Sequence, residues 1–372
     1  MLTSLLGIRL VLWTGATIPS PPDRDVMASL VRVKVTNDAR LGDGFQLTFA
    51  AAKRADGSYD LDSSSAFDPL NRVWVGVVMG AVPEVLVDGV ITQTQLEPSN
   101  QPGLSTFMVT GTGLSLKLDL EERAERYPNQ PDSVIVTQLL AAYPELGLVP
   151  VVTPTTDVPI EVDRVPRQRG TDLDFIHKAA GRNGFVFRIE PVTFGVNTAY
   201  WGPDNRIGLP QPALSVNLGA STNVRRLTFG NDALAPVGAK GSFIEPIAKL
   251  RIPIPSLPPL RLPPLAASAV PAARTELLAD TANANPAQAL LASQAVSTRA
   301  AEPLTAEGEL DSIHYGTVLR ARRPVGVRGA GLQHDGNWQV TSVTHEITKG
   351  SYSQQFALAR EGTGALLPVV RP

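Results

Sequence analysis

Residues Leu319–Arg360 read LRARRPVGVRGAGLQHDGNWQVTSVTHEITKGSYSQQFALAR, the strongest strand pattern in this 372-residue chain. Apolar and polar residues alternate over Trp338–Ile347 and again over Gln355–Ala359. A period of two, rich in β-branched and aromatic residues, is typical of strands with one buried face. Lys349-Gly350-Ser351 between the runs allows the positive φ of a tight turn. The stretch therefore predicts an antiparallel hairpin over Gly336–Arg360.

The first 118 residues also have a strand pattern throughout. Val31, Val33 and Val35 alternate with polar residues, and Val73–Met79 is a continuous apolar run typical of a strand buried on both faces. A second hairpin is predicted over Leu86–Leu114. Leu2–Trp13 is apolar but contains Arg9, and no basic segment precedes it, so a first β-strand is favoured over a signal peptide.

The middle of the chain changes to a mixed pattern. Pro131-Asp132-Ser133 begins a predicted helix that Pro144 ends. A second helix follows Thr171, which forms a capping box with Asp174, and Asn183-Gly184 ends it. A strand leaves over Phe185–Ile189, so we expect a small α+β domain here.

A weak internal repeat connects the two β regions. Leu47-Thr48-Phe49 recurs as Leu227-Thr228-Phe229, and Asp88-Gly89 recurs as Asp335-Gly336. Matches this short also arise by chance. The second spacing is longer by roughly the length of an unusual stretch between Leu250 and Thr305. Together these observations predict two similar β-barrels, the second of which carries an insertion.

The insertion begins with the proline-rich run Ile252–Leu265, IPIPSLPPLRLPPL. Proline fixes φ and removes backbone donors, so this run is neither a helix nor a central strand. We expect an extended tether, with a docking strip for a partner's aromatic groove as the alternative. Asn285-Pro286 then begins a predicted helix that ends near Arg299.

Composition excludes several classes of protein. The chain has no cysteine, which excludes a disulfide scaffold and thiolate chemistry. Its net charge of −2 implies no general attraction to nucleic acid or to anionic membranes. The apolar run at Leu2–Trp13 is shorter than the ~20 residues that span a bilayer. We therefore expect no membrane span and no specific nucleic-acid binding.

The search for catalytic or metal-binding motifs gives no candidate. His345-Glu346 opens like the zinc-protease pattern H-E-x-x-H, but Lys349 occupies the fifth position and the segment is a strand. The four histidines show no ligand spacing. Asp172 and Asp174 lie in a first helical turn, where they complement the helix dipole. We expect no catalytic residue, no metal and no cofactor.

Two stretches resemble a known family. The order V-G-V-R-G-A-G, D-G, W-Q-V-T-S-V-T-H, K-G and strand over Val325–Arg360 is similar to the end of the phage late control protein D family, the baseplate hubs of contractile tails. Arg167–Ile189, RQRGTDLDFIHKAAGRNGFVFRI, resembles the helix–strand segment in the middle of these hubs. The hub part of type VI secretion spike proteins is also similar.

The resemblance implies a mainly β (α+β) fold with two tube-protein-like antiparallel barrels. We place the first barrel at residues 1–118, the α+β domain at 119–184, and the second barrel at 185–250 and 305–361. Residues 251–304 form the proline-rich and helical insertion, and 362–372 a tail.

The resemblance also implies a structural role in the baseplate. The chain would be made in the cytoplasm and assembled as a homotrimer that joins the hexameric inner tube to a separate trimeric spike protein, next to baseplate wedge proteins. The hairpins Leu86–Leu114 and Gly336–Arg360 would be equivalent and line a central channel. The residues expected there are Val87, Ile91, Phe107, Val109, Trp338, Val340, Val343 and Phe356.

The basic cluster of Arg320, Arg322, Arg323 and Arg328 has three interpretations. One interpretation is a phosphate site, and another is a charged strand edge that resists aggregation. The resemblance to baseplate hubs implies a third, a rim that contacts a partner subunit. Two other functions remain open for the whole chain. A cell-wall hydrolase on a β scaffold would require a pair of carboxylates, and a carbohydrate-binding β module is the third possibility.

Overall fold

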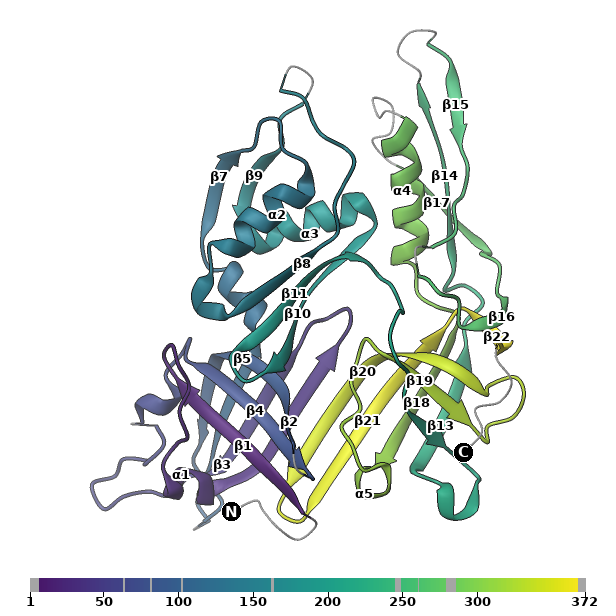
Figure 1. Cartoon of the computed structure of the whole chain (residues 1–372). Coiled ribbons are helices and arrows are strands. Elements are labelled where there is room, and N and C mark those ends of the chain that lie inside the picture. Colours follow the sequence, from purple (N-terminus) through teal and green to yellow (C-terminus); the bar gives the residue numbers. More distant parts are fainter. Residues whose placement is uncertain are drawn as a thin grey trace.

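The main feature of the molecule is a 12-stranded sheet made of two half-sheets (Figure 1). This computed structural model describes residues 7–62, 64–80, 82–101, 103–161, 164–244, 249–259, 261–278 and 286–366. Strands account for 48% and helices for 17% of the structure, so the predicted mainly β class is confirmed.

The first half-sheet contains the six N-terminal strands in the order β1-β4-β5-β6-β3-β2. They are β1 (Ile8–Gly15), β2 (Leu30–Asp38), β3 (Gly44–Ala50), β4 (Arg72–Met79), β5 (Val82–Glu97) and β6 (Thr106–Gly113). The strands curl around one core, in which Leu12 of β1 and Val75 of β4 belong to the same cluster as Leu47 of β3. The predicted first strand is therefore present from Ile8; residues 1–6 lie outside the described ranges.

The second half-sheet has the order β12-β19-β20-β21-β18-β13. Its strands are β12 (Gln211–Ser215), β13 (Val224–Asn231), β18 (Leu304–Asp311), β19 (Pro324–Arg328), β20 (Gly336–Thr348) and β21 (Ser351–Arg360). If the six strands of each half are numbered in the order of the sequence, both half-sheets have the same spatial order, 1-4-5-6-3-2. Neighbouring strands run antiparallel in both half-sheets, with one exception. β12 runs parallel to β19, whereas the equivalent strands β1 and β4 are antiparallel.

Irregularities recur at equivalent positions and show that the two halves are repeats. Thr92 of β5 and Thr341 of β20 are the extra residues of β-bulges, at which two residues oppose one on the partner strand. Each hydroxyl donates to a carbonyl of the next strand, at 3.2 Å to Thr110 and 3.0 Å to Ala357. The predicted equivalence of the two hairpins agrees with this topology.

The positive-φ residues before the fourth strand of each half match in the same way. Leu70 has φ 68° and Arg322 has φ 66°. Their N–H groups donate to the carbonyls of Ile91 (2.9 Å) and Val340 (2.7 Å), which precede the two bulges. Few residues other than glycine adopt this conformation, so its repetition is informative.

The sequence matches that suggested the repeat are themselves misaligned. Leu47-Thr48-Phe49 lies on β3, the third strand of its half, whereas Leu227-Thr228-Phe229 lies on β13, a second strand. Aligned through the bulges, Asp88-Gly89 corresponds to Asn337-Trp338 rather than to Asp335-Gly336. The repeat is real, but these short matches are coincidental.

The α+β domain lies above the first half-sheet (Figure 1). It contains β7 (Glu122–Arg126), α2 (Asp132–Ala141), β8 (Leu148–Val152), β9 (Arg167–Thr171), α3 (Asp172–Asn183), β10 (Phe185–Thr193) and β11 (Val196–Pro203). The Thr171 hydroxyl accepts from the N–H of Asp174 at 3.2 Å, as the capping box predicted, and Gly184 ends α3 with φ 65°.

The boundary predicted at residue 184 is wrong. Strands β10 and β11 form a sheet with β8, and Trp201 of β11 is buried in the core of the α+β domain. The alternation of Phe185–Ile189 marks a strand but not the sheet that it joins. This domain therefore extends to Pro203.

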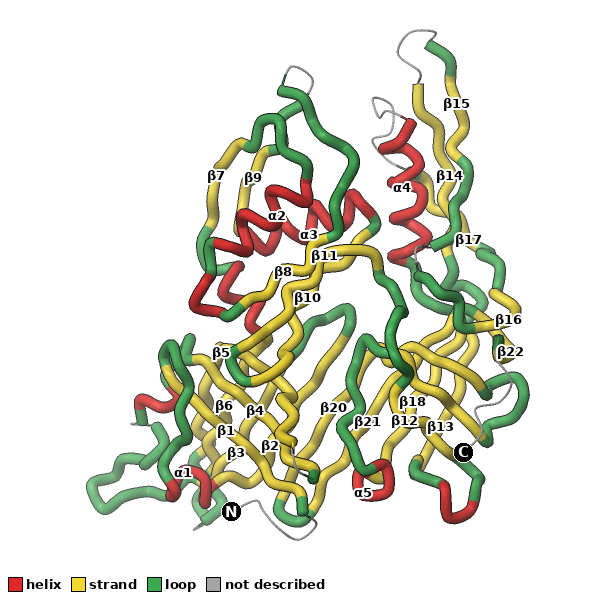
Figure 2. The backbone as a smooth tube through the Cα atoms, viewed as in Figure 1, coloured by secondary structure: helices red, strands yellow, loops and turns green. Residues whose placement is uncertain are grey.

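A projecting arm lies above the second half-sheet, beside the α+β domain (Figures 1 and 2). It consists of the sheet β15-β14-β17 and helix α4, which packs on β14. Its elements are β14 (Val237–Ile244), β15 (Arg251–Ile254), β17 (Arg274–Leu277) and α4 (Pro286–Arg299). Residues 237–244 were predicted in the second barrel, but within the described ranges β14 pairs with β15 and β17 and with no strand of the 12-stranded sheet.

The proline-rich run was predicted to be an exposed tether or arm, and most of its described residues are indeed exposed in the projecting arm, but the run is anchored rather than free. Ile254 pairs with Gly241 on β14, and both Ile254 and Leu265 are buried. Beyond it, β16 (Ala266–Ala269) pairs with β22 (Gly362–Ala365), so the start of the predicted tail is a strand. Residues 367–372 lie outside the described ranges. The run stays out of the 12-stranded sheet, as expected.

Short helices complete the connections. They are α1 (Arg24–Ser29), α5 (Ser312–Tyr315) and the 3-10 turns Ser65–Phe67, Leu114–Leu118, Pro144–Leu146 and Gly219–Ser221. Within the described ranges, no helix combines the length and apolar character that crossing a membrane requires.

Replacing Ile176 by Asp tests the packing of α3. Ile176 is fully buried in the core of the α+β domain, so Ile176→Asp places an unpaired charge there and should cost at least about 3 kcal/mol of unfolding free energy. Thermal unfolding measures the loss. Lys178→Gln, at an exposed position of the same helix, should leave the midpoint nearly unchanged. An unchanged midpoint for Ile176→Asp would contradict this packing.

Candidate assembly interface

Several edges of the large sheet lack a neighbouring strand in the described part of the chain, among them the outer edges of the terminal strands β1 and β12, and two others are of complementary kinds. β13 is bonded only to β18. β5 is bonded to β6 along its second half, but its other neighbour, β4, pairs only with residues 82–90. The outer edges of β13 and of residues 92–97 therefore present backbone groups that a further strand could satisfy.

The same two kinds of edge are already joined once inside the chain. β2, the counterpart of β13, runs antiparallel to the second half of β20, the counterpart of β5. Thr36 lies opposite Thr344, with their hydroxyl oxygens 3.3 Å apart. The guanidinium of Arg32 is 2.7 Å from the carboxylate of Glu346. We refer to the β2–β20 pairing as the internal junction.

A buried histidine lies in the internal junction. His345 pairs with Val35 across the junction, and its Nδ1 is 2.9 Å from the hydroxyl of Tyr352. Burial lowers the pKa of His345 to about 3, and the nearby Arg320 acts in the same direction. This side chain is therefore a neutral component of the core at ordinary pH.

The residues predicted to line a channel are on the wrong face of the hairpins. These residues belong to the core, and at most 4% of each one is exposed: Val87, Ile91, Phe107, Val109, Trp338, Val340, Val343 and Phe356. Alternation correctly separated two faces, but the apolar face packs inside each half-sheet. The residues between them, such as Thr110, Thr344 and Gln355, face outward and are partly or fully exposed.

Two arginines of the predicted rim instead connect the two half-sheets. Arg320 donates to the carboxylate of Glu84 at 2.7 Å, and Arg322 donates to that of Asp43 at 2.7 Å. Both acceptors belong to the first half of the chain, so these arginines brace the internal junction. Arg328 is half-buried and donates to the hydroxyl of Ser215 at 2.6 Å. Arg323 is exposed, so a partner contact remains a hypothesis for that residue.

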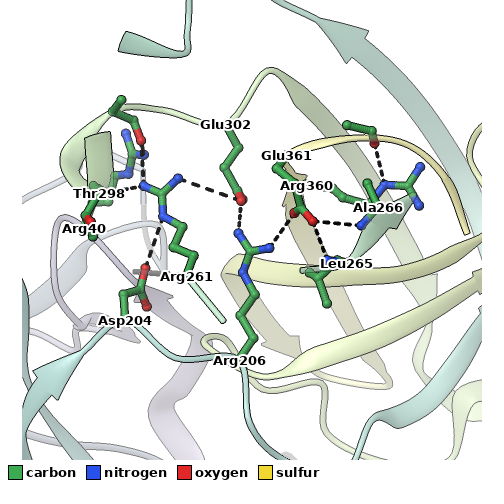
Figure 3. A network of polar contacts seen from close by, with 12 residues as sticks. Arg40, Asp204, Arg206, Arg261, Leu265, Ala266, Thr298, Glu302, Arg360 and Glu361 are labelled. Atoms are coloured by element: carbon green, nitrogen blue, oxygen red, sulfur yellow. Dashed lines mark hydrogen bonds and ion pairs between the residues drawn. The ribbon is translucent and has the colours of Figure 1, made fainter. Parts of the chain in front are cut away.

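A buried ionic network fixes the proline-rich run to the second half-sheet (Figure 3). Arg206, which follows β11, forms ion pairs with Glu302 and with Glu361. Glu361, just after β21, also accepts from the N–H groups of Leu265 and Ala266. One carboxylate thus holds the end of the run and the arginine together.

Arg261 makes the second attachment in this network. Its guanidinium donates to the carbonyls of Thr298 (2.5 Å) and Ala300 (2.6 Å) at the end of α4, and lies 3.6 Å from the carboxylate of Asp204. Burial lowers the pKa of Arg261 to about 10. No pattern in the sequence indicates this network, because its charges are far apart along the chain and only the fold brings them together.

The described ranges contain no cluster of three or more His, Asp or Glu side chains arranged to hold a metal ion. The Asp172 carboxylate is fully buried and accepts from the Tyr143 hydroxyl (2.7 Å) and the Gln168 amide (2.6 Å), while Arg123 lies 3.1 Å away. This carboxylate is therefore occupied in holding the start of α3 to the rest of its domain.

Comparison with solved structures finds the same fold in tail proteins. The 43 kDa tail protein of prophage MuSo2 from Shewanella oneidensis matches with a TM-score of 0.63 and 12% identity, over 95% of this chain and 98% of that one. A tail protein from Neisseria meningitidis MC58 matches with a TM-score of 0.62 and 13% identity, over 95% and 96% of the two chains. The chain has the fold of phage tail proteins.

A third structure extends the likeness to secretion machines. An E. coli component of the type VI secretion system, described as similar to T4 bacteriophage tail proteins, matches with a TM-score of 0.54 and 13% identity, over 92% of this chain and 78% of that one. No protein-family model matches the sequence, and no curated protein matches it. The resemblance seen in the sequence is thus confirmed at the level of the fold.

The ionic network generates a prediction about the arm. Arg261→Ala leaves the carbonyls of Thr298 and Ala300 without this donor and should cost about 1–3 kcal/mol of local stability. Limited proteolysis should then cut within residues 237–299 at lower protease concentration, while the β circular-dichroism signal stays unchanged. Arg274→Ala removes an exposed arginine from the same arm and is the control. Equal resistance of both variants would show that the network does not hold the arm.

The buried histidine generates a prediction about pH. Folding lowers the pKa of His345 from 6.5 to about 3, so the unfolded chain binds this proton more readily. The contribution of neutral His345 to the free energy of unfolding is complete above pH 6.5 and is lost as the pH falls toward 3. His345→Leu should therefore reduce the loss of unfolding free energy between about pH 7 and pH 5 by on the order of 1–2 kcal/mol. Urea unfolding at both pH values measures this.

His314→Leu, at an exposed position, is the matched control and should keep the acid sensitivity of the parent chain. If His345→Leu also keeps that sensitivity, His345 is not the group that titrates.

Proposed function

We propose that this chain is a structural baseplate hub of a contractile phage tail or of a phage-tail-like injection system. One observation carries the proposal: a half-sheet is repeated within the described part of the chain, and the repeat leaves β13 and the second half of β5 unpaired on their outer edges, although their counterparts β2 and β20 pair with each other. The tail-protein fold supports the same role. An element with unlike, complementary edges forms rings by head-to-tail association.

The role that fits this arrangement is symmetry adaptation. Three copies would supply six similar half-sheets in a ring with true threefold order, matching a hexameric inner tube on one face and a separate trimeric spike protein on the other. Baseplate wedge proteins would surround the ring. The hub would be made in the cytoplasm and incorporated into the particle.

The polar faces of the hairpins would line the channel of such a ring. Thr110 on β6 and Thr344 and Glu346 on β20 are among the residues on this face. Small hydroxyl side chains and charges keep a passage wet and give cargo no apolar surface to adhere to. The function is therefore mechanical, and it requires no catalytic group.

The test is the stoichiometry of the chain in its particle. We expect affinity purification of a tagged chain to recover a tail-like particle, and electron microscopy to place three copies between tube and spike. Light scattering of the complex with the spike protein should give a hub contribution of three times 39.6 kDa. A chain that lies elsewhere in the particle, or in another copy number, would contradict the proposal. Hydrolysis of isolated peptidoglycan by the pure chain would favour the hydrolase alternative.

A further inference from the structure

We propose that copies of this chain join by repeating the internal junction, with β13 of one copy antiparallel to residues 93–99 of the next. This inference rests on the proposed hub function and adds the register of the contact. In that register Thr228 lies opposite Glu97, Phe229 opposite Leu96 and Gly230 opposite Gln95. The partner is a second copy of the same chain.

The register on the β13 side follows from its equivalence to β2. Both strands have a β-bulge where they pair with the third strand of their half. The extra residue is Val31 in β2, opposite β3, and Arg225 in β13, opposite β18. From these bulges onward, Thr36-Asn37-Asp38-Ala39 aligns with Gly230-Asn231-Asp232-Ala233. Three of these four residues are identical, so sequence and structure give the same alignment.

The register on the β5 side follows from the threonine bulges. With Thr92 aligned to Thr341, Gln95 corresponds to Thr344 and Glu97 to Glu346. The first half of β20 pairs with β19 and its second half with β2, whereas the first half of β5 pairs with β4 and its second half is left open. The open half is thus the exact counterpart of the half that the internal junction occupies.

The charge pair of the internal junction has counterparts at the open edges. Arg32 and Glu346 form an ion pair across the junction, and their equivalents are Arg226 and Glu97. Arg226 is exposed on one open edge and Glu97 on the other. Opposite charges on diagonal cross-strand neighbours favour one register over its alternatives.

The apolar side chains at the two open edges are also complementary. Phe229 and Leu96 are each only partly buried, and their counterparts in the internal junction are Val35 and His345, which are buried against each other's strands. Pairing the open edges would cover Phe229 and Leu96 together. The contact therefore combines backbone pairing, one ion pair and one apolar pair.

Engineered cysteines test the register, because the chain has no cysteine of its own. Gly230→Cys combined with Gln95→Cys should give covalent trimers on mild oxidation of the complex with the spike protein. Thr36→Cys with Thr344→Cys is the matched control, since it makes the same cross-link inside one chain. Gly230→Cys with Glu97→Cys shifts the pair by two residues and should link at least about tenfold less.

Charge reversal tests the ion pair separately. Arg226→Glu and Glu97→Arg should each weaken assembly of the trimer by about tenfold or more, because three junctions carry the same repulsion, and the double variant should restore it. Trimers in which only the shifted cysteine pair links would overturn the register and leave the hub function standing. Absence of trimers in the particle would overturn both.

Discussion

The structure depends on one constraint, which is that backbone N–H and C=O groups along a strand edge need partners. Each half-sheet has one edge strand of the β2 type and one half-open strand of the β5 type. The chain joins one of each in the internal junction and leaves one of each exposed. In the proposed ring, a second copy would pair with the two edges that remain open.

Charged side chains make the internal junction specific. Arg320 and Arg322 reach from the second half to Glu84 and Asp43 of the first, and the Arg322–Asp43 pair is largely buried. Removing either partner of a buried pair would leave an uncompensated charge, which favours the observed docking over a slipped one. The arginines expected at an outer rim therefore fix the relative position of the half-sheets.

Local patterns in the sequence predicted elements better than they predicted neighbours. The alternation of Gly336–Arg360 gave the hairpin, and Thr171 gave the start of α3, because both signals depend on adjacent residues. Alternation also separated the two faces of each hairpin, but it could not show which face is covered. The same limit explains why β10, β11 and β14 were assigned to the wrong sheet. The Asn-Asp-Ala repeat at residues 37–39 and 231–233 was the signal in the sequence that would have aligned the halves.

The arm shows why the two halves are not interchangeable. In the first half, β2 and β3 are joined by the short turn of residues 39–43, whereas the equivalent connection from β13 to β18 contains the whole arm. The ionic network around Arg206 and Glu361 holds the middle and the end of this insertion, at Leu265, Ala266 and Glu302, to the end of β21. In the proposed ring, six similar half-sheets would then carry only three arms. A threefold partner would therefore have a feature to recognise on every second unit, while a sixfold partner could contact the half-sheets that all six units share.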